Sequence, residues 1–263
     1  MLAKAAAVVQ KDFLTAVRYR NGVFLTAFAP AMQLFLSFYL AHAVGPQYRP
    51  DGFSYFSFLL VGTGLFMFLH SCMHGFLNVI QEAQHTGTLE VLMTTSTPPI
   101  TLLCLAALSA TGTAVLQFVA YIAVGLFFLP SQLHINPLAA AAVLLLSVLI
   151  SIAFGILAAG LQLSIQKGSV VLWLFGTTAW VFAGTLFPVG SLPVPLRVLA
   201  QWMPLTHSLT AMRLAMFGGP APASLTHEIQ VLLAFAAFFL PAGALFFSRT
   251  LRRARRLGTL TFY

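Results

Sequence analysis

The stretch that decides the fold is residues 81–99, QEAQHTGTLEVLMTTSTPP, which lies between two long apolar segments. It holds Glu82 and Glu90, two of the five carboxylates in the chain. Thr86 or Thr88 is positioned to cap a short helix that ends before the two prolines. In a chain with so few charges, a polar helix-forming loop predicts a role beyond solubility. We interpret it as a cytoplasmic coupling element on which a separate energy-supplying protein acts.

The composition on either side of this stretch is typical of a membrane protein. Of the 263 residues, 59% are hydrophobic and only 7% are charged. Soluble domains carry about 25% charged residues. A chain of this length accommodates about six spans of roughly 20 apolar residues each, with little left for an extramembrane domain. The composition therefore predicts an all-α polytopic membrane protein with a single transmembrane domain, and it excludes a soluble globular protein.

Apolar runs bounded by turn residues predict six transmembrane helices. These are residues 23–44, 55–80, 100–129, 137–164, 169–187 and 229–247. Residues 1–20 predict an amphipathic helix on the inner membrane surface, because Lys4, Lys11 and Arg18 recur every seven residues beside an apolar stripe. Residues 188–217 stay apolar despite repeated proline and glycine, which indicates two short re-entrant helices in the outer leaflet.

The basic residues flank the apolar segments and indicate the orientation of the chain. The net charge is +8, and its placement favours contact with anionic lipid over nucleic acid. With the N-terminus inside, ten basic residues are cytoplasmic and only Arg49, Arg197 and Arg213 are outside. The ten are Lys4, Lys11, Arg18, Arg20, Lys167, Arg249, Arg252, Arg253, Arg255 and Arg256. The sequence therefore predicts cytoplasmic termini, and a cytoplasmic coupling segment, in a plasma (bacterial inner) membrane.

The sequence does not contain the residue patterns typical of two energy sources, ATP hydrolysis and proton coupling. A phosphate-binding loop needs Gly-Lys, and none of the three lysines follows a glycine, so we expect no ATP hydrolysis by this chain. Proton-driven transporters usually place carboxylates within their spans. Here Asp12, Glu82 and Glu90 are expected in the cytoplasm, Asp51 in an outer loop and Glu228 at the outer mouth of span 6.

Two histidines are candidates for metal binding or proton transfer. His70 and His74 are four residues apart on span 2, so both imidazoles lie on one helix face. No third ligand accompanies them in the sequence, and packing within the helix bundle is the favoured interpretation. An intramembrane metal-dependent enzyme using this pair and a self-sufficient secondary transporter remain open alternatives.

Two further residue pairs predict packing contacts. Gly155 and Ala159 form a small-x3-small pair, which is typical of closely packed membrane helices. Arg213 has a side chain long enough to pair with Glu228 at the outer rim. Both predictions concern structure only.

Three segments of the chain resemble the ABC type-2 transporter family. Residues 82–98 are similar to the family's Glu-x4-Gly-Thr-Leu-Glu-x-Leu-x-x-Thr-Pro segment, with extra residues between Leu92 and Pro98. Residues 184–188, GTLFP, resemble the end of the family's fifth helix. Residues 204–213, PLTHSLTAMR, are similar to its Pro-Leu-x-His-x5-Arg signature. Order and spacing agree across nearly the whole chain.

The resemblance implies the permease subunit of an ATP-binding-cassette exporter. In that family two membrane subunits, here expected to be an identical pair, act with two copies of an ATPase that bind ATP and Mg, and the membrane chain holds no cofactor. The implied substrate is an amphipathic small molecule, a lipid-like molecule or a glycan. Residues 1–20 would be a connecting helix that touches the ATPase. The residues implied at the ATPase are Glu82, Gly87, Thr88, Leu89 and Glu90, and those implied in the outer re-entrant signature are Gly184, Phe187, Pro188, Pro204, Leu205, His207 and Arg213.

Overall fold

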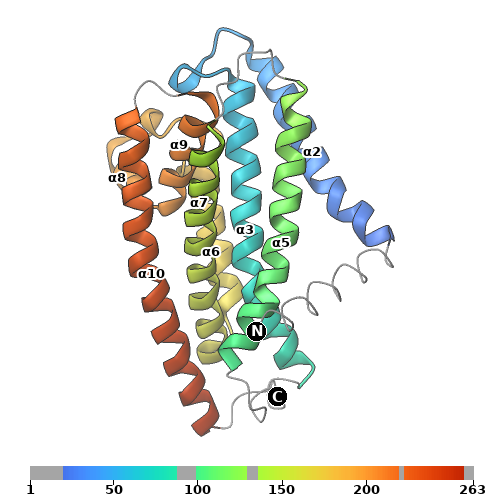
Figure 1. The fold of residues 1–263 in the computed structure, drawn as a ribbon, viewed down its shortest axis with the longest axis vertical. Coiled ribbons are helices and arrows are strands. Elements are labelled where there is room, and N and C mark those ends of the chain that lie inside the picture. Colours follow the sequence, from blue (N-terminus) through green and yellow to red (C-terminus); the bar gives the residue numbers. More distant parts are fainter. Residues whose placement is uncertain (1–19, 88–98, 129–135, 219–221, 258–263) are drawn as a thin grey trace.

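The computed structural model describes residues 20–87, 99–128, 136–218 and 222–257, and every regular element in this part is helical (Figure 1). The expected surface helix of residues 1–19 and the coupling residues Thr88, Leu89 and Glu90 lie outside the described residues. The longer helices are α2 (Arg20–Val44), α3 (Tyr55–His85), α5 (Pro99–Leu126), α6 (Pro137–Ile165), α7 (Gly168–Phe182) and α10 (Pro222–Leu257). The shorter ones are η1 (Pro50–Gly52), η2 (Val189–Ser191), α8 (Val194–Gln201) and α9 (Pro204–Phe217).

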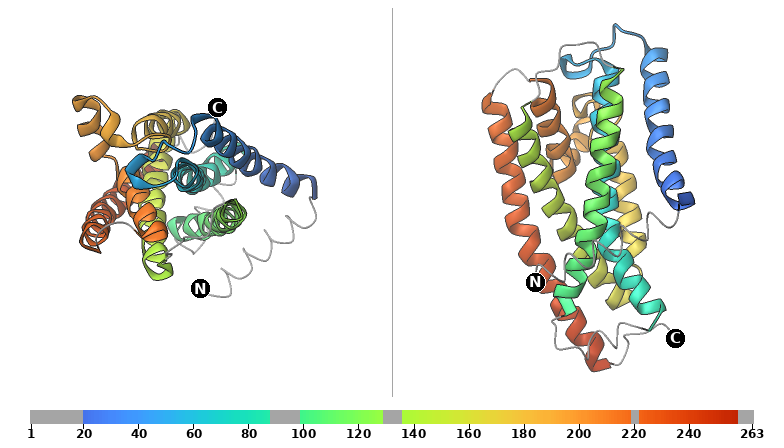
Figure 2. Two further views of the ribbon diagram at one scale, coloured as in Figure 1. Left: turned by 90° about the horizontal axis from the view of Figure 1, so that it is seen from above. Right: turned by 45° about the vertical axis from the view of Figure 1, so that its right-hand side comes forward.

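Helix α3 is the centre of the bundle. It begins after Ser54, whose hydroxyl oxygen accepts a hydrogen bond from the backbone N–H of Ser57 at 3.2 Å. It packs against α2, α5, α6, α7 and α9, whereas α2 lies at the edge of the bundle when the molecule is viewed from above (Figure 2). Phe58 and Leu65 of α3 are completely buried. The apolar sequence of α3 is therefore covered by other helices on most of its circumference.

The predicted close packing at Gly155 and Ala159 is confirmed. A Cβ atom added to Gly155 would lie only 2.7 Å from the backbone oxygen of Met73 on α3. Ala159 has no exposed surface and belongs to a buried cluster that also includes Phe76 of α3 and Phe247 of α10. Small side chains on α6 thus let the backbones of α3 and α6 approach each other.

Three helices differ in length from the predicted spans, whose membrane bounds stay predictions. Residues 81–85 are the last turn of α3, so the coupling segment begins inside this helix. Helix α7 ends at Phe182 and not at residue 187, because the chain turns at Gly184, where φ is +86°. Helix α10 extends past residues 229–247 at both ends and includes the terminal arginines, which are good helix formers.

The length and composition of the helices agree with a membrane protein. Among the described residues, three helices are long and apolar enough to cross a membrane, namely Tyr55–His85, Pro137–Ile165 and Ser224–Ala254. Three shorter apolar helices accompany them, Phe28–Val44, Thr111–Leu126 and Gly168–Phe182. The prediction of an all-helical membrane protein is confirmed, and the count of six spans stays a prediction.

The contact at Gly155 predicts a stability difference between two glycine variants. Gly155→Ala places a methyl group against a backbone oxygen that cannot move aside, and we expect it to cost about 1–3 kcal/mol. Gly112→Ala on α5 is the control, since a Cβ there meets nothing within 4 Å. The apparent melting temperature of the purified protein should fall only for Gly155→Ala. Equal melting temperatures for the two variants would contradict the close approach of α3 and α6.

Candidate functional sites at the two ends of the bundle

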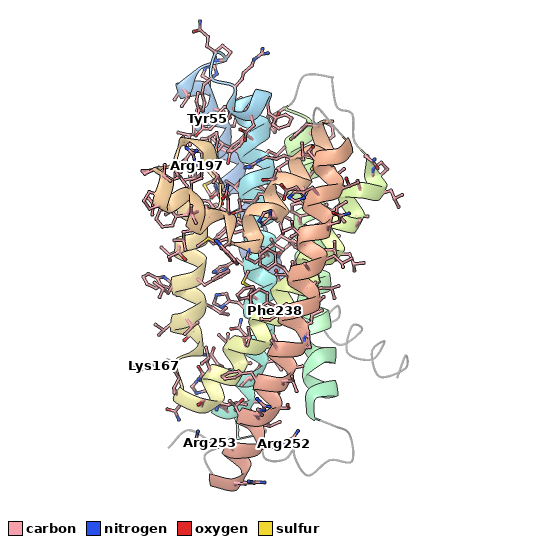
Figure 3. All side chains as sticks on the ribbon, turned by 90° about the vertical axis from the view of Figure 1, so that its left-hand side faces the viewer. Tyr55, Lys167, Arg197, Phe238, Arg252 and Arg253 are labelled. Carbon is pink, nitrogen blue, oxygen red and sulfur yellow. The ribbon has the colours of Figure 1, made fainter. Side chains whose placement is uncertain are left out.

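The two ends of the bundle differ in charge. Figure 3 shows Lys167, Arg252 and Arg253 at one end and Tyr55 and Arg197 toward the other. We call the first the basic end, defined by the five cations Lys167, Arg249, Arg252, Arg253 and Arg256. Among the described side chains, none of these five forms an ion pair. An uncompensated cluster of this kind suits an anionic lipid surface or an acidic partner.

Residues 81–87, the described part of the coupling segment, form the last turn of α3 and its cap at the basic end (Figure 1). The backbone N–H and the hydroxyl of Thr86 both donate to the backbone oxygen of Glu82, at 2.9 and 2.8 Å. Gly87 follows with φ of +68°, the left-handed conformation that commonly ends a helix. Thr86 therefore caps the end of α3, which corrects the expectation that it begins a separate short helix. The side chain of Glu82 is exposed in this last turn.

A buried polar chain behind Glu82 connects three helices, and the sequence analysis missed it. Gln84 and Gln162 are only 3% and 2% exposed. The amide of Gln162 on α6 donates to the Gln84 side-chain oxygen at 3.5 Å and accepts from the backbone N–H of Gly168 at 3.0 Å. The chain thus ties the end of α3 to the junction of α6 and α7. Gln162 lies within the apolar run of span 4, and polar side chains inside spans usually have a partner. This position could therefore have indicated the contact from the sequence.

At the opposite end, Arg213 joins three segments of the chain. This α9 side chain is 5% exposed. Its Nη2 donates to the backbone oxygens of Phe58 on α3 at 3.1 Å and of Gly184 after α7 at 2.8 Å. Its guanidinium carbon lies 3.5 Å from the centre of the Phe58 ring, which adds a cation–π contact. Two residues of the predicted outer signature, Gly184 and Arg213, are therefore in direct contact.

The space for Arg213 depends on Gly62 of α3, which the sequence analysis did not identify. A Cβ atom at Gly62 would clash with the backbone oxygen of Thr185 and lie 2.6 Å from Nη2 of Arg213. The position needs glycine because two other segments fill its side-chain space. Nothing in the local sequence reveals this, since Gly64, two residues later, faces Tyr121 of α5 instead.

Glu228 pairs with His207 and not with Arg213, which corrects the predicted pair. Nδ1 of His207 lies 2.6 Å from the Glu228 carboxylate, and Nε2 lies 2.8 Å from the backbone oxygen of Gln201. Both partners are acceptors, so the doubly protonated ring satisfies both contacts. Burial alone would lower the pKa of His207, but the hydrogen bonds to Glu228 and Gln201 outweigh it and raise this pKa.

The remaining signature residues form the frame around these contacts. Pro204 occupies the first position of α9, where its missing N–H costs nothing, and both Pro204 and Leu205 are buried. Phe187 and Pro188 are partly buried and carry the chain from α7 into η2. Residues 188–217 contain η2, α8 and α9, and their re-entrant position in a membrane stays a prediction. The signature thus gathers at one end of the bundle, around α9.

The predicted shared face of His70 and His74 is present, with ring centres 4.3 Å apart. The ring of His70 also lies 5.8 Å from that of Phe66. In the part of the chain that the structure describes, no group of three or more His, Cys, Asp or Glu side chains is placed to hold a metal ion. The pair by itself supplies two of the three protein ligands that a catalytic zinc site typically uses.

These features together define a helical membrane protein with a polar contact site at each end of its central helix. A family profile described as "ABC-2 family transporter protein" matches residues 32–245. The match spans most of the chain, and the chain belongs to this family of ABC transporter membrane subunits, or permeases. No curated protein matches the sequence.

The geometry at Arg213 predicts that lysine is not an adequate replacement. Lysine has no flat guanidinium to reach both carbonyls while it lies over the Phe58 ring. We expect Arg213→Lys to lower the free energy of unfolding by about 1–3 kcal/mol, the cost of leaving a buried acceptor unpaired. Arg252→Lys at the exposed basic end is the matched control and should leave the apparent melting temperature unchanged. A stable Arg213→Lys protein would show that the two carbonyls do not depend on the guanidinium.

The raised pKa of His207 predicts a pH dependence of stability. The folded state holds this proton more tightly than the unfolded chain, so the stabilisation is complete below the unfolded pKa of about 6.5. It is lost as the pH rises through the higher pKa of the folded protein. The apparent melting temperature should therefore fall as the pH rises above about 6.5, and this fall should be smaller in His207→Gln. Identical profiles for the two proteins would assign the pH dependence to another group.

Proposed function

We propose that this permease is the membrane subunit of an exporter driven by a separate ATPase that docks at the basic end. The continuity of α3 carries the proposal. One unbroken helix of 31 residues, about 46 Å long at about 1.5 Å per residue, contains Phe58 and Gly62 near one end and Glu82 near the other. A push delivered at Glu82 moves the Arg213 contacts at the far end as part of the same rigid body.

The buried polar chain supports the same mechanical role. Because Gln84 is joined to Gln162 and Gly168, a displacement of the end of α3 also acts on α6 and α7. The proposed power stroke is therefore a tilt of several helices together and not a local rearrangement of one loop. Membership of the family supports the partner class, since ABC-2 membrane subunits typically act with an ATPase subunit.

We further propose six spans, a cytoplasmic basic end and an outer end built from α8 and α9. The cations Lys167 and Arg249 to Arg256 favour the cytoplasmic side under the positive-inside rule. Helix α8 supports the outer, lipid-contacting position, because Val194 and Trp202 are 70% and 75% exposed. The proposed location is a plasma membrane of bacterial inner-membrane type.

The proposed assembly holds two copies of this chain and two ATPase subunits, which bind ATP and Mg. The absence of a Gly-Lys phosphate-binding loop supports ATP binding on the partner. The second copy is proposed from the resemblance to the family, in which two membrane subunits act together. The proposed substrate is an amphipathic small molecule or lipid-like molecule, and the glycan class implied by the resemblance stays a second possibility.

Charge reversal in the coupling segment tests the proposal. The permease is co-expressed with its ATPase, and the amount of ATPase that co-purifies is measured together with ATP hydrolysis. Glu82→Arg and Glu90→Arg should each reduce co-purified ATPase about tenfold, which corresponds to about 1.4 kcal/mol. Asp51→Arg is the matched control, because Asp51 is an exposed carboxylate near the opposite end.

Membrane insertion should be unchanged in all three variants, and the apparent melting temperature should be unchanged in Glu82→Arg and Glu90→Arg. Normal co-purification with Glu82→Arg and Glu90→Arg would contradict docking at this segment. Loss of the ATPase with Asp51→Arg alone would reverse the proposed orientation.

A further inference from the structure

Several of the cavities in the described bundle follow one another along α2, α3 and α5. One cavity of about 520 Å³ opens between α2 and α5, and its walls include Phe35, Phe38, Tyr39 and Phe128. A second, of about 400 Å³, lies deeper between α2, α3 and α5. Both volumes fall in the range of small-molecule sites, which are mostly apolar with a few polar groups.

The two cavities are neighbours that share part of their walls. Pro30 of α2 and both Gln117 and Tyr121 of α5 line the first as well as the second. Pro30 lies inside α2 and removes one backbone hydrogen bond from it, which weakens and bends a helix at that point. In Figure 1, α2 leans away from α5 toward the N-terminal end of α2. The opening between these helices therefore has a local cause in the chain.

Gln117 is the polar group at the junction of the two cavities. Its side chain is partly buried and makes no hydrogen bond with the described residues. The neighbouring hydroxyl of Tyr121, by contrast, lies 2.9 Å from that of Thr63 and is already engaged. A primary amide left without a partner in an apolar membrane region costs free energy that a ligand recovers by bonding to it.

A third cavity continues toward the basic end and is more polar. It has about 440 Å³, and Met67, Ser71 and Thr113 line it together with the second cavity. His70, His74 and Asn78 complete its polar side. The walls therefore change from aromatic near Phe128 to polar near Asn78.

We propose that the first two cavities form a binding site for a neutral amphipathic molecule, with its aromatic or alkyl body between Phe35 and Phe128 and its polar group on Gln117. The third cavity is the polar route by which such a molecule reaches the site from the basic end. The aromatic walls match an apolar body, and the amide of Gln117 both donates and accepts, so it selects a hydroxyl or carbonyl group. This inference rests on the proposed transport function and names the substrate class and its site.

Photo-cross-linking to the purified permease, without any ATPase, tests this site. The probe is 4-hydroxybenzophenone, which carries two aromatic rings, a hydroxyl and a carbonyl. We expect saturable cross-links that map to the cavity-lining parts of α2 and α5. Gln117→Leu, of similar size but without the amide, should weaken apparent binding roughly three- to tenfold, as for the loss of one hydrogen bond.

A matched pair of alanines supplies the steric test. Ala120 lines the first cavity, whereas Ala123 is equally exposed on α5 but lines none of the three cavities. Ala120→Trp should reduce cross-linking about tenfold and Ala123→Trp should leave it unchanged. If Ala120→Trp lowers the melting temperature, its loss of cross-linking could reflect misfolding. In that case Gln117→Leu alone tests the site.

The controls separate this site from bulk lipid and from the transport proposal. A phosphatidylcholine with a benzophenone on its acyl chain is cross-linked in parallel and should label the two alanine variants alike, because bulk lipid reaches both exposed positions. Unsaturable labelling by 4-hydroxybenzophenone, or its equal labelling of Ala120→Trp and Ala123→Trp, would overturn the site. Saturable labelling of a permease that binds no ATPase would support the site while the exporter proposal fails. Unsaturable labelling of a permease that does bind its ATPase would overturn only the site.

Discussion

The positions of α2, α5, α6, α7 and α9 depend on how closely each of these helices approaches α3. A membrane interior lacks water to satisfy exposed backbone groups, and an α-helix such as α3 satisfies them internally, so neighbouring helices can pack directly against its backbone. Glycine allows this approach from several directions. Gly125 of α5 faces Leu60, Gly155 of α6 faces Met73, and Gly62 of α3 itself receives Arg213. Each contact removes the space that a side chain would occupy, which makes the position of α3 rigid relative to its partners.

This rigidity links the two ends of the molecule. At one end, Arg213 bridges α9, α3 and the turn after α7 through backbone oxygens. At the other, Gln162 bridges α3, α6 and the start of α7. Backbone oxygens and amides hold their position without a titrating partner, so both bridges persist across the physiological pH range. Of the three contacts named here, the His207–Glu228 pair, between α9 and α10, is the one that responds to protons.

The α2 side of the bundle has the opposite character. The α6–α10 side contains the buried cluster around Phe76 and Phe247, and its own cavity of about 540 Å³ lies beside Arg253 at the basic end, whereas apolar-walled cavities separate α2 from α5. A transporter needs both properties, since a rigid part transmits force and a loosely packed part accommodates different occupants. The loosely packed part lies at Pro30 of α2 and at Gln117 of α5, which bonds to none of the described residues.

The sequence by itself determined the helical membrane class, most of the helix positions, the charge difference between the ends and the close packing at Gly155. These follow from properties of single segments, namely apolar length, the placement of basic residues and the spacing of small residues. Only the tertiary structure decided the partner of Arg213, the need for glycine at position 62 and the joining of Gln84 to Gln162. These depend on segments far apart in the chain, such as Phe58 and Arg213, which are separated by 155 residues. A side chain in a span takes the polar partner that packing brings within reach, and the sequence around it does not specify which helix supplies that partner.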